Sequence, residues 1–158
     1  MTTGMTLAIL GGVLSVVLGG FGSIIAVGRA GKAASAVITE EPEKFGKALI
    51  LEALPGTQGI YGFLVGIMLF QKVGILGGTP EELTIELGWY FFFVCLAAAL
   101  TGFLSAIFQG KVCNSGMQVL AKKPAEVTKA IILAAMVETY AVLGLLISIL
   151  LINGVQLS

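Results

Sequence analysis

Four long apolar runs dominate the chain, over residues 7–27, 48–70, 87–108 and 130–152. An α-helix needs about 20 residues to cross the hydrocarbon core of a bilayer, and each run is at least that long. Only 11% of the 158 residues are charged, well below the roughly 25% of an ordinary soluble domain. Backbone polar groups in lipid must be satisfied within the span, so we expect helices in spite of the many glycines. The predicted fold class is an all-α membrane protein with four transmembrane helices.

The chain contains an internal duplication. Residues 20–69 align with residues 102–151 at a constant offset of 82, without a gap and with 17 identities in 50 pairs. The short loops TEEPEK and AKKPAE carry proline at the same place in each copy. An even number of spans separates the copies, so both have the same orientation in the membrane. We therefore predict two tandem helical hairpins as the structural units, residues 1–75 and 76–158.

The basic residues gather beside two of the three loops. Only Lys72 flanks the 71–86 loop, in a region that also holds three glutamates. The positive-inside rule places the short loops 39–44 and 121–127 in the cytoplasm, and both termini outside. The remaining basic residues, all near these short loops, are Arg29, Lys32, Lys44, Lys47, Lys111, Lys122, Lys123 and Lys129.

Small residues recur at every fourth position of the first run and, more weakly, of the third. This spacing lets helix backbones approach closely in lipid. It is explained either by packing of the four helices within one chain or by a crowded surface such as the inner wall of a ring. The small residues are Gly11, Ser15, Gly19 and Ser23 in the first run, and Ala98, Gly102, Ala106 and Gly110 in the third.

Glu138 is the only charged residue between Lys129 and the end of the chain. A carboxylate near the middle of a membrane span costs about 2.5–3.5 kcal/mol on insertion scales, and such residues usually mark an ion or proton path. The alternative is a structural carboxylic acid that hydrogen-bonds between helices. The equivalent position in the first copy is Gly56, which has no side chain. One carboxylate of a possible two is therefore present.

Polar side chains interrupt the second run. Thr57, Gln58 and Tyr61 follow Leu54 at the i, i+3, i+4, i+7 spacing and share one helix face. Proline has no backbone N–H, so Pro55 leaves the carbonyl of Leu51 short of a donor. The adjacent Gly56 makes local distortion easy.

Gln109 is the polar residue of the third run that we expect at the same depth. It lies 15 residues before Pro124, and Glu138 lies 14 residues after it. The two side chains can therefore meet across the second hairpin.

Together these groups form a set of hard oxygen donors around one negative charge, which suits a small monovalent cation. A proton carrier would need only the carboxylic acid, so the additional amides and hydroxyl favour Na⁺ over H⁺. No Lys or Arg lies at the depth of Glu138, so the counter-charge of the empty site must come from water or from another subunit. The chain has no His and no Asp, which excludes a zinc site or a Ser-His-Asp triad of the usual kind.

The combined motifs resemble one family, the rotor proteolipids (K or c subunits) of bacterial sodium-pumping V-type ATPases. They are LPGTQGIYGF (54–63), FQGK (108–111), KKP (122–124) and AAMVETYAVLG (134–144). The resemblance covers nearly the whole chain and implies a membrane ring of identical subunits that hydrolyses nothing itself.

The resemblance also implies a ligand set for Na⁺. Its members would be Glu138, Gln109, Thr57, Gln58 and the carbonyl of Leu54, with Tyr61 hydrogen-bonded to the carboxylate. The implied partners are a stator subunit that supplies an Arg and a central stalk at loops 39–44 and 121–127. No organic cofactor is implied. Glu52 departs from the family pattern, in which we expect Gln, and an interfacial or hydrated role is expected for it.

Two other functions are compatible with parts of the pattern. A proton-translocating rotor subunit would need the same fold and Glu138. A small proton-coupled exporter with four helices would also carry one essential Glu, but it would need a roomy aromatic pocket around it.

Overall fold

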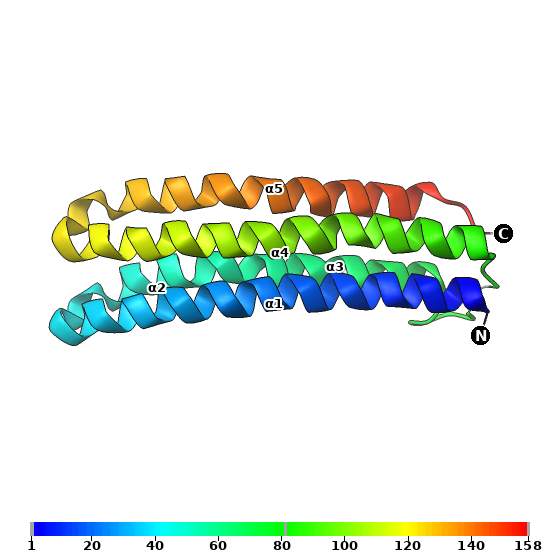
Figure 1. The fold of residues 1–158 in the computed structure, drawn as a ribbon, viewed down its shortest axis with the longest axis horizontal. Coiled ribbons are helices and arrows are strands. Elements are labelled where there is room, and N and C mark those ends of the chain that lie inside the picture. Colours follow the sequence, from blue (N-terminus) through cyan, green and yellow to red (C-terminus); the bar gives the residue numbers. More distant parts are fainter. Residues whose placement is uncertain (1, 81, 158) are drawn as a thin grey trace.

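Four long helical rods lie side by side in the computed structural model, which describes residues 2–80 and 82–157 (Figure 1). Two rods are unbroken helices of 38 residues, α1 (Thr3–Glu40) and α4 (Ile85–Lys122). Each is followed by a short turn and a second rod. The elements of these second rods are a 3₁₀ turn (Pro42–Lys44), α2 (Phe45–Ala53), a 3₁₀ turn (Leu54–Gly56) and α3 (Thr57–Lys72), and then a 3₁₀ turn (Pro124–Glu126) and α5 (Val127–Gly154).

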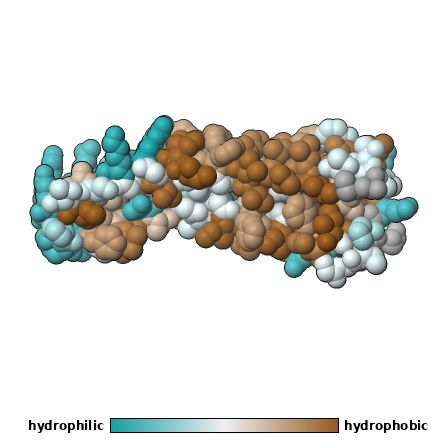
Figure 2. Space-filling view, turned by 90° about the horizontal axis from the view of Figure 1, so that it is seen from below, coloured by the Kyte–Doolittle hydropathy of each residue, from teal (hydrophilic) through white to brown (hydrophobic). Residues whose placement is uncertain are grey.

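All four rods are long and apolar enough to cross a membrane, as predicted. A 38-residue helix is about 57 Å long, whereas the hydrocarbon core of a bilayer is about 30 Å thick. The rods therefore extend beyond the apolar layer. Figure 2 shows a broad hydrophobic band over most of the molecule and hydrophilic side chains at the end that carries the two short turns.

The two hairpins are parallel copies, which confirms the prediction from the duplication. Both short turns lie at one end of the bundle and both chain termini lie at the other (Figure 1). The most extensive helix contact joins α1 to α4, while α3 packs on α1 and α5 packs on α4. The first helices of the two hairpins thus form the main contact between the hairpins.

Glycines let α1 and α4 approach closely. A Cβ atom added to Gly110 would lie 2.6 Å from the Cβ of Ala26, and one added to Gly11 would lie 2.7 Å from the Cα of Phe92. Both distances are below van der Waals contact, so neither position has room for a side chain. Packing within the chain therefore accounts for part of the row of small residues.

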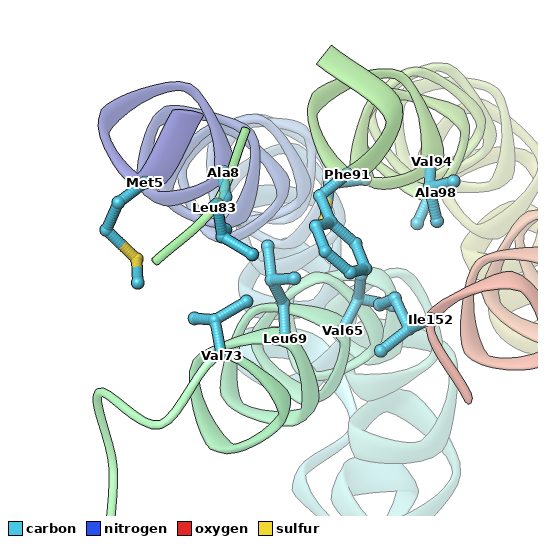
Figure 3. Packing of buried hydrophobic residues seen from close by; sticks show 11 residues of the cluster. Met5, Ala8, Val65, Leu69, Val73, Leu83, Phe91, Val94, Ala98 and Ile152 are labelled. Carbon is cyan, nitrogen blue, oxygen red and sulfur yellow. The ribbon is translucent and has the colours of Figure 1, made fainter. Parts of the chain in front are cut away.

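Near the termini, apolar side chains from α1, α3, α4 and α5 fill the space between the hairpins (Figure 3). Phe91 of α4 lies beside Val65 and Leu69 of α3 and Ile152 of α5, and all four are fully buried. Leu83, from the connection between the hairpins, is also buried in this cluster. The close packing of these side chains holds the two hairpins together at the end of the bundle that carries the termini.

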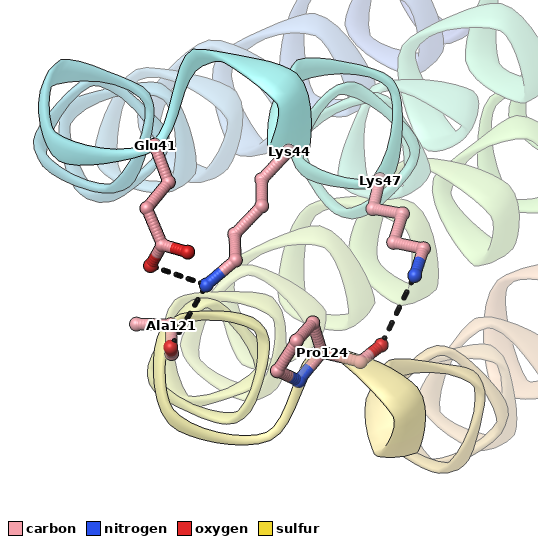
Figure 4. Close-up of polar contacts among 5 residues, drawn as sticks. All are labelled: Glu41, Lys44, Lys47, Ala121 and Pro124. Atoms are coloured by element: carbon pink, nitrogen blue, oxygen red, sulfur yellow. Dashed lines mark hydrogen bonds and ion pairs between the residues drawn. The ribbon is translucent and has the colours of Figure 1, made fainter.

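At the opposite end, two lysines of the first hairpin reach the turn of the second (Figure 4). Lys44 forms an ion pair with Glu41 and donates to the carbonyl of Ala121 at 3.0 Å. Lys47 donates to the carbonyl of Pro124 at 3.2 Å. Lys44 is only 7% exposed, and a buried lysine requires such partners. These contacts tie the two turns together.

Candidate ion-binding site

Pro55 interrupts the second rod near its middle. Residues Leu54–Gly56 form a single 3₁₀ turn between α2 and α3, and the N–H of Thr57 bonds the carbonyl of Leu54. The cause is local, because proline cannot donate the hydrogen bond that would continue an α-helix. The structure therefore confirms the distortion predicted from Pro55 and Gly56. It also sets the Leu54 carbonyl 3.0 Å from the hydroxyl of Thr57.

The carboxylate of Glu138 accepts hydrogen bonds from three other side chains. Its Oε1 accepts from the hydroxyl of Thr57 at 2.7 Å and from the phenol of Tyr61 at 2.5 Å. Its Oε2 accepts from the amide nitrogen of Gln109 at 3.3 Å. The donors come from α3 and α4, so both hairpins contribute to the surroundings of a single side chain on α5. Hydrogen bonds to an ionised acceptor are stronger than those between neutral groups.

Thr57 stands between the carboxylate and the backbone. A hydroxyl has one proton to donate, and its oxygen lies 2.7 Å from Glu138 and 3.0 Å from the Leu54 carbonyl. Donation to Glu138 leaves the Leu54 oxygen with an unused acceptor position at the site.

Two glutamines lie directly behind the carboxylate, and both are fully buried. The amide nitrogen of Gln58 donates to the amide oxygen of Gln109 at 2.5 Å and to the hydroxyl of Ser105 at 3.3 Å. Within the described part of the chain, the amide oxygen of Gln58 is buried without a hydrogen-bond partner. A buried acceptor left unsatisfied costs about 1–3 kcal/mol. A small cation between the amides and the carboxylate would satisfy it.

No basic side chain neutralises Glu138. Across residues 2–80 and 82–157, ion pairs occur only near the two turns, between Lys44 and Glu41 and between Lys129 and Glu126. The charge of an ionised Glu138 is therefore met only by neutral donors inside the chain. This agrees with the sequence argument that the counter-charge of the empty site must come from water or from another subunit.

Glu138 also faces outward. Its side chain is half-buried, and it lines a shallow groove of about 340 Å³ on α5 together with Ala135, Thr139, Val142 and Leu143. The carboxylate thus lies between fully buried amides on one side and the outer surface of the bundle on the other. An ion bound at the carboxylate would therefore be close to the outer surface of α5.

The structure brings together all six residues predicted for the site. Thr57, Tyr61 and Gln109 contact Glu138 directly, Gln58 contacts Gln109, and the Leu54 carbonyl contacts Thr57. Their role as ion ligands remains a prediction.

The sequence analysis did not predict a polar role near the site for two serines. Ser105 accepts from Gln58 and donates to the carbonyl of Val137 at 2.9 Å. Ser23 accepts from the N–H of Gly59 at 2.9 Å. A signal for Ser105 was present, because it lies one helical turn before Gln109 and so on the same face.

Comparison with known proteins agrees with this geometry. The ATP synthase C-subunit family matches residues 10–69 and again residues 92–151, the same offset of 82 as the duplication. The V-type sodium ATPase subunit K of Enterococcus hirae is 48% identical over 149 residues, which cover 94% of this chain and 92% of that protein. The A-type ATP synthase subunit K of Methanocaldococcus jannaschii is 39% identical over 158 residues, which cover 98% of this chain and 66% of that protein. The chain therefore belongs to the ATP synthase C-subunit family, and it is a non-catalytic membrane rotor subunit of a rotary ATPase.

Proposed function

We propose that this rotor subunit transports Na⁺ across the membrane, one ion for each chain. The observation that carries the proposal is the carboxylate of Glu138, which has no ion-pair partner among the described residues, linked through Gln109 to Gln58, whose buried amide oxygen has no hydrogen-bond partner. A proton on the carboxylate neutralises the charge but gives a single O–H donor, which engages one acceptor. A cation would satisfy the oxygen and the charge together.

The proposed ligands are oxygen atoms from four segments. Glu138 supplies the charge, Gln109, Gln58 and Thr57 supply side-chain oxygens, and Leu54 supplies its carbonyl. Hard oxygen donors of this kind suit alkali ions, and one carboxylate balances one monovalent charge. Tyr61 holds the carboxylate through its 2.5 Å hydrogen bond. The occupied site is neutral and is able to face lipid.

Similarity supports Na⁺ over H⁺ as the ion. The relative that is 48% identical is named a V-type sodium ATPase subunit. Because this chain presents a lone carboxylate with two glutamines beside it, we extend that ion to it.

The mechanism we propose is rotary. Identical copies form a ring, which turns with a central stalk held at loops 39–44 and 121–127, and ATP hydrolysis in other subunits drives the rotation. Each Glu138 in turn passes a stator subunit, whose Arg favours release of Na⁺. Both loops lie in the cytoplasm and both termini lie outside. Residues 1–75 and 76–158 act as the two hairpin units, of which only the second carries the carboxylate.

Carbodiimide labelling of Glu138 tests the ion. The reagent modifies a protonated carboxylic acid, so bound Na⁺ excludes it. We expect millimolar Na⁺ to protect Glu138 at fixed pH, as measured by mass spectrometry of the labelled chain. K⁺ at the same concentration should protect much less, because the site is built around a small ion.

The control is Glu138→Gln, which removes the target and should abolish labelling. If labelling of the unmodified chain followed pH but ignored Na⁺, the rotor would transport protons and the Na⁺ proposal would fall.

A further inference from the structure

Two grooves on the single chain are left open, one on each hairpin. The first, the α1–α2 groove, has a volume of about 270 Å³. The second, the α4–α5 groove, has a volume of about 320 Å³. The α1–α2 groove is lined by Gly31, Ala34, Phe45, Ala48, Leu49 and Glu52, and the α4–α5 groove by Thr101, Leu104, Ser105, Phe108, Val137 and Tyr140.

The internal duplication shows what such grooves hold. Subtracting 82 from each lining residue of the α4–α5 groove gives a surface of the first hairpin that is buried in the bundle. This buried surface packs against the second hairpin, as the close approach of Ala26 to Gly110 shows. Its residues are Gly19, Gly22, Ser23, Ala26, Pro55 and Gln58.

The α1–α2 groove likewise corresponds to a buried surface, in this case on the second hairpin. Adding 82 to its lining residues gives a surface of the second hairpin that lies beneath the first. A Cβ atom added to Gly116, the counterpart of Ala34, would lie 3.1 Å from the side chain of Leu51. The counterparts buried there are Cys113, Gly116, Val127, Ala130 and Ala134. The two grooves are therefore the two unfilled sides of an interface that the chain already makes once within itself.

A second copy of this chain is the occupant that fits both sides. Placing the first hairpin of one copy against the second hairpin of the next repeats the internal interface and creates a head-to-tail contact, which forms a ring when the rotation between copies closes. This step rests on the ring of the proposed function. It adds the register of the contact.

The vertical alignment of the two copies follows from the close contact of Ala26 with Gly110 within one chain. Adding 82 to the first number gives Phe108, and subtracting 82 from the second gives Gly28. The equivalent contact between copies therefore joins Phe108 of one copy to Gly28 of the next. Phe108 is 53% exposed in the single chain, and a Cβ atom added to Gly28 would meet nothing within 4 Å. A large side chain thus faces an open glycine, as two complementary surfaces require.

Glu52 gives this interface an unbalanced charge. Its carboxylate lies against Gly31, 2.5 Å from where a Cβ atom would stand. It is half-buried and forms no hydrogen bond or ion pair among the residues that the structure describes. Its counterpart Ala134 is buried against Ala30 of the first hairpin. The residue equivalent to Ala30 in the second hairpin is Val112, so between copies Glu52 should lie against Val112 of the neighbour.

Lys111, which precedes Val112, supplies the matching cation. It lies one turn after Phe108, and its Nζ is 4.5 Å from the centre of that ring. Gly31 likewise lies one turn after Gly28. Because α1 and α4 run in the same direction, a contact between Phe108 and Gly28 sets Lys111 at the level of Gly31 and Glu52.

We propose that neighbouring copies dock with Phe108 of one against Gly28 of the next, and that an ion pair between Lys111 and Glu52 locks this register. The pair is intermolecular, so Glu52 is unpartnered in the single chain. It also gives a function to a carboxylate that the ion site leaves unused.

Disulfide cross-linking tests the register. Ala106 and Gly22 face each other within the chain, where a Cβ on Gly22 would lie 3.1 Å from that of Ala106, so their counterparts Ile24 and Leu104 should meet between copies. The variant carrying Ile24→Cys and Leu104→Cys should give a ladder of cross-linked oligomers on oxidation. Both side chains are exposed in the single chain, and the native Cys95 and Cys113 are buried.

The matched control carries Ile24→Cys with Leu100→Cys, one turn away, which is too far for direct disulfide geometry. A ladder from this control but not from the test pair would overturn the register. So would intact rings of the test variant without any cross-link. Absence of rings from the unmodified protein would instead overturn the ring of the proposed function.

A charge reversal tests the ion pair. Glu52→Lys and Lys111→Glu should each increase the monomer fraction several-fold in detergent at moderate temperature, and the double variant should restore the ring. The readout is native mass spectrometry. Na⁺ protection of Glu138 in the restored ring reports on the ion site separately. A double variant no more stable than the singles would refute the pair.

Discussion

The two hairpins share a backbone plan but differ in their chemistry. Pro42 and Pro124 begin equivalent 3₁₀ turns, and Thr57 and Thr139 each bond the carbonyl three residues earlier, at 3.0 and 2.7 Å. Yet among the described residues only the hydroxyl of Thr57 also contacts a carboxylate, that of Glu138 in the other hairpin. Duplication has kept what shapes the helices, while the ion site depends on groups that differ between the copies.

The differences are complementary. The first hairpin provides Gln58 and Tyr61, where the second has Tyr140 and Leu143. The second provides Gln109 and Glu138, where the first has Val27 and Gly56. Neither hairpin therefore holds a complete donor set. The site exists only where α3 of the first hairpin packs against the second hairpin.

Exchanging the carboxylate between the hairpins is the strongest test of this asymmetry. Glu138→Gln should abolish Na⁺ transport and leave the ring assembled, because the charge is lost but the shape is kept. The double variant Gly56→Glu with Glu138→Gly should remain inactive, since position 56 lies beside Val27 and lacks the glutamine pair. Transport is measured as ²²Na⁺ uptake into vesicles containing the whole complex.

Recovery of transport in the double variant would show that any carboxylate at this depth suffices. The complementary donor sets would then be irrelevant to the function.

Gln109 tests the contribution of the amides. Gln109→Val introduces the residue found at the equivalent position of the first hairpin. It removes the donor to Glu138 Oε2 and the acceptor for Gln58. Leaving buried polar groups unpaired costs about 1–3 kcal/mol, so we expect the Na⁺ concentration that half-protects Glu138 to rise about 100-fold.

Gln118→Val, a substitution of the same chemistry on an exposed part of α4, is the matched control. It should leave the half-protecting concentration unchanged. An equal effect of the two substitutions would mean that Gln109 acts on the helix and not on the ion.

The architecture could be predicted from the sequence because its signals are local and repeated. The matching prolines, the fixed offset and the four apolar runs each specify elements without reference to other helices. The break at Leu54–Gly56 was predicted for the same reason, since proline imposes it. Glu138 and Gln109 were placed together correctly because both could be counted from one proline.

What the sequence left open depends on side-chain orientation between helices. The missing N–H of Pro55 pointed to the carbonyl of Leu51 as a free acceptor. In the structure, it is the carbonyl of Leu54 that lies beside Thr57, in the 3₁₀ turn. The unpartnered oxygen of Gln58 follows from its amide nitrogen being used by Gln109 and Ser105. No spacing rule along one helix gives that arrangement.

The threonine pair provides the finest comparison, with the smallest expected effect. Thr57→Val removes a hydroxyl that lies 2.7 Å from Glu138, and Thr139→Val removes one that bonds only the carbonyl of Met136 among the described residues. A hydrogen bond to a charged group contributes about 1.5–3 kcal/mol. Thr57→Val should therefore weaken Na⁺ protection of Glu138 by about tenfold or more.

Thr139→Val should leave that protection within about twofold, because valine keeps the shape of threonine and Thr139 points away from the ion site. Thr139→Val removes only a bond to a backbone carbonyl, so the difference between the two variants reports on the contact of Thr57 with Glu138. Equal half-protecting concentrations for the two variants would mean that the Thr57 hydroxyl serves the helix alone. The ion would then have one ligand fewer than proposed. The Leu54 carbonyl would also lose support as a ligand, because its contact with Thr57 is what connects it to the site.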